Sequence, residues 1–420
     1  MNNDFVFKPK QTPRPPKPEE PELEDSEAPS EDGHESVDTS SEDDSNIPTE
    51  DSPAPEKEPK SKEKKTRRSP KQWFLDLTKK QKILLGISTG LFLAGLIVLG
   101  LVVFGGSKKA DAPAKKQAAV KKVEKPKTEA SKLTGVQISP ELNKRSITGI
   151  MIENSLDARP QAGLKDAGVV YEAIAEGGIT RFLTLFQEGQ PDYIGPVRSV
   201  RPYYLDWVQG FDAPIAHAGG STDALAKLRA DGVKDLDQFA NGNSYTRVNN
   251  REAPHNLYTG TAQMDALKTA KGFTTSTFTS LARKKEQPNK TPTAKTVDLV
   301  ISSTDFNPHY DYDAKTNSYK RSEGGAPHTD ERSGAQLSPK VVIALVMSQG
   351  RQGVYTTYNA IGSGACFIFQ DGIVTEGTWI KANAKDQTTF KDARGEEIKL
   401  NPGQTWISTV GSSGAVTYAP

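Results

Sequence analysis

A run of 22 residues without a charge, Ile83–Phe104, limits the architectures open to this chain more than any other segment. At a rise of about 1.5 Å per residue, a helix over this run is about 30 Å long, the thickness of a bilayer's hydrocarbon core. The run begins roughly 80 residues into the chain, which argues against a cleaved signal peptide. It is apolar on every side, which argues against a buried helix of a soluble domain. The sequence therefore predicts one transmembrane helix at residues 83–104, with the membrane as a partner.

The segments on either side of this run contain too few apolar side chains to form a core. Between Glu19 and Glu58 there are 17 acidic residues and one basic residue, Lys57. Such a chain cannot bury enough apolar surface to offset the entropy of ordering it, so residues 1–70 are predicted to be a disordered tail. Pro13–Pro21 has the composition of a polyproline ligand, but a solvated tail is the simpler interpretation. Residues 105–135, rich in Lys, Ala and Pro, are predicted to be a flexible linker.

The basic residues that flank the predicted span give a small preference for its orientation. Five lie within about 15 residues before it and four within the same distance after it, which favours a cytoplasmic N-terminal tail and extracytoplasmic C-terminal domains. They are Arg68, Lys71, Lys79, Lys80 and Lys82 before the span, and Lys108, Lys109, Lys115 and Lys116 after it. The net charge of the whole chain is +1, so its overall field gives no reason to expect a nucleic acid as partner. A single cysteine excludes an intrachain disulfide.

From residue 136 onward, short apolar runs alternate with Gly, Pro and polar residues. Intermixed strands and helices predict an α/β or α+β domain over 136–282. The polar, Pro-containing segment 283–292 marks a boundary, and a small, mostly β domain is predicted over 293–420. Asp371-Gly372, between two strand-like runs, is a hairpin turn signature. The expected strands are 147–152, 169–175, 179–187, 213–217, 297–302, 340–348, 353–359, 365–370, 373–379 and 405–410, and the expected helices are 203–211, 222–229 and 261–271.

Polar side chains gather where these apolar runs end, which is where strands pass into loops and sites are usually built. Four arginines and three glutamates lie there among apolar, Gly or Pro neighbours. We favour an arrangement in which they pair with one another and hold the loops together. In the alternative, some arginines stay free to bind a phosphate, a carboxylate or an acidic sugar polymer. The candidate ligand-binding residues are Glu153, Asn154, Arg159, Glu172, Glu176, Arg181, Arg198, Ser199, Arg201, His217, Ser221, Arg251, His255 and Asn256.

Several of these candidates have both a functional and a structural interpretation. The Gly219–Ser221 turn offers backbone donors to an anion at the start of a predicted helix, but a turn glycine and an N-cap serine explain it equally well. His217, His255 and Glu176 are candidate acid–base groups or metal ligands. Their spacing matches no compact motif such as HExxH, so ordinary hydrogen bonds are favoured and neither a metal nor a cofactor is predicted. The two candidate serines lie in no Gly-x-Ser-x-Gly nucleophile pattern.

Two features of the C-terminal part also have both a functional and a structural interpretation. Cys366 with His328 suggests a nucleophile like that of cell-wall transpeptidases, but its neighbours are strand-like and apolar, so a buried thiol is favoured. Four aromatic residues suit either a glycan-binding surface or a core, and core packing is the commoner role. They are Trp379, Trp406, Tyr355 and Tyr358.

Ordered motifs in both halves match a known family. They are Ala158–Leu164, Tyr171-Glu172, Glu176–Phe182, Gly195–Pro202, Pro327-His328, Gly362–Gly364, Asp371-Gly372, Gly377–Trp379 and Pro402–Trp406. With these motifs, residues 147 to 406 resemble the YerB-like family, bacterial envelope proteins defined as a domain of unknown function. The resemblance implies a two-domain fold outside the membrane and supplies no catalytic mechanism. Lipoprotein members carry a Cys after the apolar run, whereas Gly105–Ser107 follow it here, so the helix itself is expected to be the anchor.

These observations predict a membrane-anchored, extracytoplasmic binding or scaffolding protein of the bacterial cell envelope, linked to cell-wall assembly. Its expected partner is a cell-wall polymer or a cell-wall synthesis protein. The alternative is an envelope enzyme that acts on an anionic cell-wall substrate, held by Arg159, Arg181, Arg198 or Arg201 while a Glu or His moves protons. Arginines that all pair with carboxylates would favour the first prediction, and arginines facing a cleft beside an unpaired Glu or His would favour the second.

Overall fold

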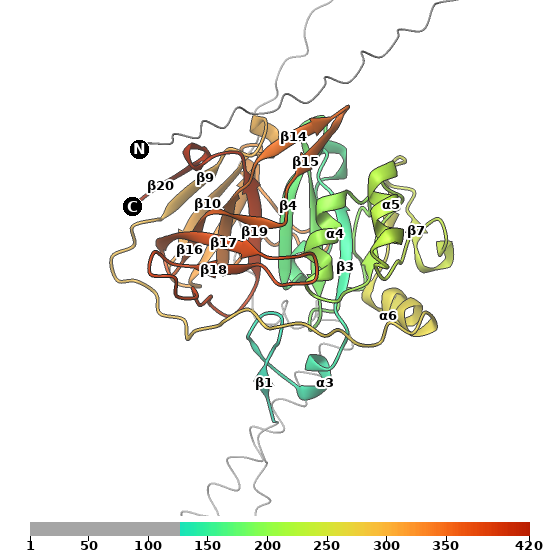
Figure 1. The fold of residues 1–420 in the computed structure, drawn as a ribbon, viewed down its shortest axis with the longest axis horizontal. Coiled ribbons are helices and arrows are strands. Elements are labelled where there is room, and N and C mark those ends of the chain that lie inside the picture. The colour runs from blue at the N-terminus through green and yellow to red at the C-terminus, as the bar shows by residue number, and fades with distance from the viewer. Residues whose placement is uncertain (1–126) are drawn as a thin grey trace, which may run out of the picture. The chain divides into compact units, whose positions relative to one another are not determined.

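The computed structural model describes residues 127–420 (Figure 1). The predicted disordered tail, the predicted span at 83–104 and most of the predicted linker lie outside this range. Within residues 127–420, no helix is both long and apolar enough to cross a membrane. The anchor therefore stays a prediction from the sequence.

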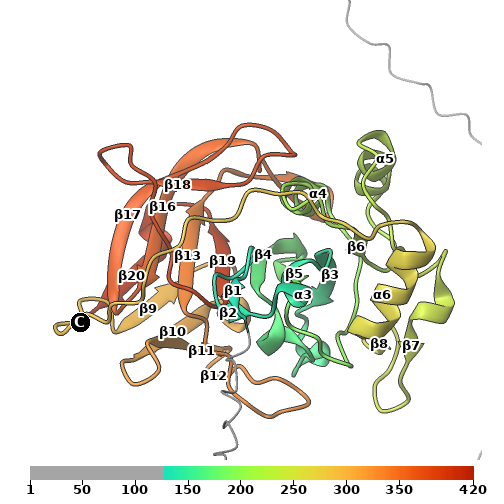
Figure 2. The same cartoon turned by 90° about the horizontal axis from the view of Figure 1, so that it is seen from below.

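A large mixed sheet forms the centre of the described chain (Figures 1 and 2). Eleven strands belong to it, and two of them, β14 (Gln349–Gln352) and β15 (Tyr355–Tyr358), form a hairpin that joins the sheet where Tyr355 pairs with Glu176. The other nine, in spatial order, are β18 (Thr389–Lys391), β17 (Ile373–Lys381), β16 (Gly362–Gln370), β13 (Val341–Val346), β19 (Thr405–Val410), β4 (Val169–Glu176), β5 (Ile179–Phe186), β3 (Thr148–Glu153) and β6 (Ile215–Ala216).

A second sheet and a few helices complete the fold. The second sheet has five strands, which in spatial order are β12 (Ala326–Pro327), β11 (Ser318–Glu323), β10 (Pro308–Asp313), β9 (Thr296–Leu299) and β20 (Val416–Ala419). Two-stranded pairs are formed by β1 (Glu129–Ala130) with β2 (Gln137–Ile138) and by β7 (Thr246–Arg247) with β8 (Leu257–Tyr258). The helices are α3 (Pro140–Asn143), α4 (Pro202–Gln209), α5 (Thr222–Ala230) and α6 (Thr261–Ala270), and the 3-10 turns are η1 (Leu156–Ala158), η2 (Leu164–Asp166), η3 (Gly242–Ser244), η4 (Thr304–Phe306) and η5 (Ser413–Ala415).

The central sheet runs through both predicted domains. Strand β19, near the C-terminus, lies parallel to β13 on one side and parallel to β4 on the other. Residues 169–172 therefore pair directly with residues 405–408, across the boundary predicted at 283–292. The division into two domains stays a prediction from composition. The pairing of β19 with β4 was not predicted, because pairing between strands far apart in the sequence leaves no local signal.

The large sheet is covered on both faces, so its strands are apolar on both sides. Along β4, for example, Val169, Tyr171 and Ala173 face the cluster that contains α4 and α5, whereas Val170 faces the opposite side. On that opposite side, α6 and the loops around it cover the N-terminal strands. The five-stranded sheet covers β13 and β16 through contacts such as Phe369 with Tyr319. Figure 2 shows α4 above the sheet and α6 beside it.

The observed fold is mixed α+β and rich in strands, with few helices among residues 127–420, and the expected strands and helices are present. The hairpin at Asp371-Gly372 is confirmed: both residues have positive φ, 57° and 76°, as a two-residue turn of this type requires. Strands β10 and β11 were not predicted, because their sequences, PHYDYD and SYKRSE, carry polar residues that suit an exposed loop equally well. Those two strands hold much of the candidate site.

Candidate functional site

A buried guanidinium, that of Arg321 on β11, connects the two sheets. Its side chain is fully buried, and Nη2 lies 2.9 Å from both Glu172 Oε1 and Glu323 Oε1. Nη1 donates to the Tyr310 hydroxyl at 2.7 Å, and Nε donates to Nδ1 of His328 at 3.0 Å. Every donor group of a buried arginine needs such a partner, because an isolated charge in the interior is costly. Arg321 thus holds two carboxylates from different sheets in one ion-pair network.

Glu172 is the inner carboxylate of this network. Its Oε2 accepts hydrogen bonds from the Trp406 indole N–H and the Ser408 hydroxyl, both at 2.9 Å. Its Oε1 is bound by Arg321, and the residue is fully buried. Each oxygen is therefore occupied by protein donors, which gives this predicted site residue a structural role.

His328 is held neutral beside the guanidinium. Nδ1 accepts from Arg321 Nε, so the ring proton lies on Nε2, which donates to Gln161 Oε1 at 2.8 Å. Burial, together with the positive charges of Arg321 and Arg159, holds the pKa of His328 well below its usual value. The second ring nitrogen cannot gain a proton without facing the Arg321 N–H, so His328 serves as a fixed acceptor.

Glu323 is the outer carboxylate and lines an open cavity. Oε1 accepts from Asn154 Nδ2 at 3.0 Å and from Arg321 Nη2 at 2.9 Å. Oε2 has no hydrogen-bond donor within residues 127–420, although Arg159 Nη2 lies 3.3 Å away and His328 Nδ1 3.4 Å away. Burial raises the pKa of Glu323 to about 7, with Glu172 adding to the effect and Arg321 opposing it. The cavity, of about 360 Å³, is lined by Leu156, Arg159, Pro160, Asp305, Glu323, Gly324, Ala326, Pro327, His328 and Thr329, and is called the Glu323 pocket below.

Arg159 forms one wall of the Glu323 pocket. Its Nε donates to Asn154 Oδ1 at 3.1 Å, and its Nη2 donates to the backbone carbonyl of Asp305 at 2.8 Å. The guanidinium lies 5.2 Å from the centre of the Phe306 ring. Burial lowers the pKa of Arg159 from its usual value, against the opposing effect of Glu323. Of the four predicted arginines, this one borders an open cavity beside a carboxyl oxygen without a donor.

The raised pKa of Glu323 predicts a measurable pH dependence of stability. The folded state binds the proton more tightly than the unfolded chain, whose usual pKa is 4.5, so the free energy of unfolding falls as pH rises from about 4.5 to about 7. This part of the loss amounts to about 3 kcal/mol. We expect Glu323→Gln to remove it, so that the variant gains stability relative to wild type between pH 5 and pH 8 in urea titrations. The exposed Glu376→Gln is the control, and parallel pH profiles of wild type and Glu323→Gln would contradict the assignment.

A second cluster surrounds Glu153 at the end of β3. Its Oε1 lies 3.1 Å from Arg198 Nε and accepts from the Ser155 hydroxyl at 3.0 Å, and its Oε2 lies 3.0 Å from His255 Nδ1. Glu153 is buried, whereas a quarter of the Arg198 side chain is exposed. Arg198 therefore forms an ion pair with Glu153 through Nε while part of its side chain stays open to solvent.

Arg198 opens onto a cavity of about 320 Å³. It is lined by Val197, Arg198, Ser199, Ala218, Gly219, Gly220, Phe239, Arg247, Pro254 and Leu257, and is called the Arg198 pocket below. Arg247, which also lines this pocket, is exposed and donates to Asn256 Oδ1 at 2.7 Å. Gly219 has φ of 62°, and a side chain there would come within 3.2 Å of the Phe239 ring. Two guanidiniums, a serine and a glycine turn thus lie around one pocket.

A third cluster holds the turn after β4. Glu176 pairs with Arg181 at 2.7 Å and also with Arg201, whose guanidinium lies 4.7 Å from the Tyr355 ring centre. Arg181 also donates to the backbone carbonyl of Ser199 at 2.8 Å. Burial acts to raise the pKa of Glu176, but the two arginines outweigh it and hold that pKa below its usual value. Both arginines are buried, so the pairing favoured from the sequence is what holds this loop.

The two candidate histidines of the N-terminal half bind different partners. His217 is fully buried, with Nε2 3.1 Å from Asp235 Oδ1 and Nδ1 2.8 Å from the Gly219 carbonyl. His255 contacts Glu153, and neither histidine forms a hydrogen bond with Glu176. In residues 127–420 no group of three or more His, Cys, Asp or Glu side chains is arranged to hold a metal.

The remaining predicted residues stabilise loops. Ser221 caps α5 by accepting from the Ala224 N–H at 3.4 Å. Arg251 donates to the backbone carbonyls of Asp157 and Pro160, at 3.0 and 2.7 Å. Asn256 also donates to the Val248 carbonyl, at 3.1 Å, and so joins the segments on either side of this loop.

Cys366 and the aromatic residues take the structural roles favoured from the sequence. Burial raises the pKa of the Cys366 thiol to about 12, which removes the thiolate needed for a nucleophile. Trp379 and Trp406 are buried, and Tyr358 is half-buried with its hydroxyl accepting from the backbone N–H of Ile174. Tyr355 stacks on Arg201 rather than facing an open groove.

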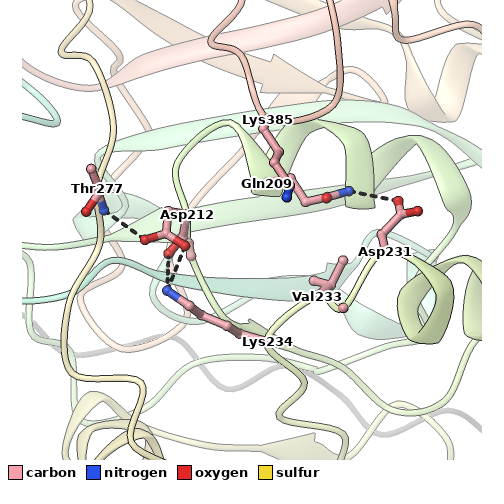
Figure 3. Close-up of a pocket in the computed structure, with 9 residues that line it drawn as sticks. Gln209, Asp212, Asp231, Val233, Lys234, Thr277 and Lys385 are labelled. Carbon is pink, nitrogen blue, oxygen red and sulfur yellow. Dashed lines mark hydrogen bonds and ion pairs between the residues drawn. The ribbon is translucent and has the colours of Figure 1, made fainter.

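A further cavity, of about 280 Å³, is lined by residues that include Gln209 at the end of α4, Asp212 and Lys234. Figure 3 shows the side chains around it. Lys234 pairs there with Asp212 at 2.7 Å, and Gln209 donates to Asp231 at 3.1 Å. Its lining includes none of the predicted site residues, and most of its charged groups are already paired. The Glu323 and Arg198 pockets are therefore the better candidates.

Sequence reasoning missed Arg321, Glu323 and Arg247 as site residues, and it named His328 only as a partner for Cys366 and in a family motif. Arg321 and Glu323 are two residues apart on β11, so their side chains lie on the same face of the strand. Alternate residues of a strand such as SYKRSE lie on opposite faces, which was the available signal for placing Arg321 and Glu323 together. Without the other sheet, this alternation does not tell which face of the strand is buried and which is solvated. The motif Pro327-His328 marked the correct loop without indicating its partners.

Comparison with known proteins completes the description. Family models named "Protein of unknown function (DUF3048) N-terminal domain" and "Protein of unknown function (DUF3048) C-terminal domain" match residues 133–274 and 297–407. "Putative lipoprotein YerB" of Bacillus subtilis (strain 168) is 31% identical over 290 residues, which cover 66% of this chain and 85% of that protein. The crystal structure of YerB protein from Bacillus subtilis aligns with a TM-score of 0.63 at 28% identity, covering 69% of this chain and 99% of that one.

Proposed function

This chain belongs to the DUF3048, or YerB-like, family, and from that premise we propose that it is a membrane-anchored binding or scaffolding protein of the bacterial cell envelope, linked to cell-wall assembly. Its relative in Bacillus subtilis is named as a lipoprotein, a class of protein held at a membrane. In this chain, a transmembrane helix at 83–104 would hold the protein at the membrane in place of a lipid anchor. In this proposal the tail lies in the cytoplasm and residues 136–420 lie outside.

The observation that carries the binding proposal is the convergence of Arg198 and Arg247 on one pocket. Arginine forks match the geometry of phosphate and carboxylate groups. The ion pair with Glu153 fixes the orientation of the Arg198 guanidinium before a ligand arrives. Ser199 and the glycines of the Gly219–Gly220 turn leave room for a ligand to approach the backbone. An anionic cell-wall polymer presents repeated groups of this charge, and is the ligand class we propose.

Thermal unfolding of the full-length chain in detergent tests this proposal. Wall teichoic acid and peptidoglycan fragments are the probes, with Arg198→Gln/Arg247→Gln as the test variant and Arg351→Gln, on the exposed strand β14, as the control. A ligand at about 100 times its Kd stabilises the native state by about 2.7 kcal/mol. We expect that shift in wild type and in the control, and its loss in the double variant. The same shift in all three proteins would exclude the Arg198 pocket, and no shift with either probe would exclude these polymers.

The alternative, an envelope enzyme acting on an anionic substrate, is favoured by a different observation. In the Glu323 pocket, a carboxyl oxygen without a hydrogen-bond donor lies beside an arginine. A group with a pKa near 7 is suited to accept and release protons at neutral pH. Besides Glu323, the pocket lining offers the Thr329 hydroxyl, Asp305 and the neutral His328. Among the described residues no base forms a hydrogen bond with the Thr329 hydroxyl to activate it as a nucleophile, so we take the binding role as the proposed function.

A further inference from the structure

We propose that the Glu323 pocket is a second ligand site, separate from the Arg198 pocket, which binds the carboxylate group of a small organic acid or peptide terminus through Arg159 and one proton shared with Glu323. The first observation is the geometry of Glu323 itself. Its residue is 5% exposed, and Oε1 is fixed by two donors, Asn154 and Arg321. Glu323 lines the pocket, and its other oxygen, Oε2, is buried and has no hydrogen-bond donor among the described residues, although Arg159 Nη2 lies 3.3 Å from it. A buried oxygen that has an ion pair but no hydrogen bond is incompletely satisfied, so a ligand that makes this hydrogen bond gains binding energy.

The second observation is the donor beside it. Arg159 is directed by Asn154 and by the Asp305 carbonyl, which occupy Nε and Nη2. Within residues 127–420, Nη1 has no hydrogen-bond acceptor, and it lies next to Gly324 in the pocket wall. A ligand carboxylate can therefore place one oxygen on Arg159 and the other within reach of a protonated Glu323.

The charges around Glu323 favour binding of an anion when Glu323 takes up a proton at the same time. The charged or titratable side chains that face it from each neighbouring element are Arg321 on β11, Glu172 on β4, Arg159 after η1, Asp305 in η4, Tyr310 on β10 and His328 after β12. Glu172 neutralises Arg321, and His328 is neutral. Protonating Glu323 leaves Arg159 without its carboxylate partner, and a ligand carboxylate restores the balance. Since the pKa of Glu323 is about 7, that proton is taken up at little cost at neutral pH.

The walls of the pocket set the size and character of the rest of the ligand. Leu156, Pro160, Ala326 and Pro327 provide apolar surface around the two polar groups. A volume of about 360 Å³ is at the lower end of the range for small-molecule sites, about 300–1,000 Å³. A carboxylate attached to a short apolar or amide-bearing group fits this description. An amide ligand, whose N–H would donate to an ionised Glu323, is the competing chemistry.

Binding of N-acetylalanine and of N-acetylalanine amide to the full-length chain in detergent distinguishes these chemistries. Affinities are measured by saturation-transfer NMR titrations at pH 6, 7 and 8. Proton uptake makes the carboxylate bind more tightly at low pH, with a loss approaching tenfold per pH unit above the pKa of Glu323. We expect the carboxylate to bind with this slope and the amide to bind at least tenfold more weakly at pH 6.

Variants of the two polar residues separate ligand binding from a purely structural role. In Glu323→Gln, Asn154 and Arg321 hold the amide oxygen, so the side-chain NH2 faces the pocket and donates to a carboxylate without a proton. This variant should bind N-acetylalanine with an affinity that changes less than twofold from pH 6 to pH 8. Arg159→Gln should lose at least tenfold in affinity at each pH, whereas Glu376→Gln should behave as wild type.

Three results would overturn the proposal. They are the absence of N-acetylalanine binding at any pH, tighter binding of the amide with an affinity that rises with pH, and an unchanged pH slope in a folded Glu323→Gln variant. Arg198→Gln/Arg247→Gln should leave N-acetylalanine binding intact, because those arginines line a different pocket. Failure of this inference therefore leaves the proposed binding of wall polymers untouched, and the reverse also holds.

Discussion

Replacing Arg321 by methionine is expected to lower the free energy of unfolding by about 3–5 kcal/mol at pH 7. Methionine fills part of the volume but removes the positive charge that faces Glu172 and Glu323. Both carboxylates are buried, and Glu172 then keeps only neutral donors, which are Trp406, Ser408 and, at 3.5 Å, Thr180. A cost of this size arises because a buried charge left without its partner cannot recover its hydration.

A matched variant decides whether the lost charge or the lost packing causes the fall in the free energy of unfolding of Arg321→Met. Arg321→Met combined with Glu172→Gln and Glu323→Gln removes all three charges and keeps the approximate shape. We expect urea titrations of the full-length chain in detergent to show that this triple variant recovers most of the loss, to within about 2 kcal/mol of wild type. A single Arg321→Met variant within about 1 kcal/mol of wild type would contradict the network described here.

Replacing Trp406 by alanine is the second large effect, with an expected cost of about 3–5 kcal/mol. Trp406 lies on β19, is fully buried, and packs edge-on against Phe182 with ring centres 5.3 Å apart. It also covers the Arg321 guanidinium at 4.4 Å and donates its indole N–H to Glu172. The substitution therefore opens a cavity and leaves a carboxylate oxygen with one donor fewer.

Trp406→Phe separates these contributions. Phenylalanine keeps most of the packing and loses the N–H, so we expect a smaller cost of about 2 kcal/mol, near that of a hydrogen bond to a charged group. Since β19 lies between β13 and β4, both variants should shift the unfolding of the two halves together in urea titrations read by tryptophan fluorescence and by circular dichroism. Two separate transitions, with only one shifted, would show that the halves unfold independently.

The candidate site illustrates how far residue patterns reach. Clusters at the ends of apolar runs indicated Glu153, Glu176, Arg181, Arg198 and Arg201, and the structure pairs these carboxylates and guanidiniums as the favoured arrangement predicts. These pairs form between strands and loops that are close in sequence, so local patterns suffice to suggest them. Arg159 was indicated too, but its carboxylate partner, Glu323, lies 164 positions further along the chain and was not.

By itself, the sequence determined many of the strands and helices in their order, the hairpin at Asp371-Gly372 and the family, and it predicts a membrane anchor. These depend on periodicity, turn chemistry and motifs, which act over a few residues. Only the tertiary structure decided that β19 joins the two halves in one sheet, and that Arg321 brings Glu172 and Glu323 together. Such contacts depend on strand register and on the burial of charges between distant segments, and no local pattern encodes either. For that reason the Glu323 pocket became visible only in the folded chain.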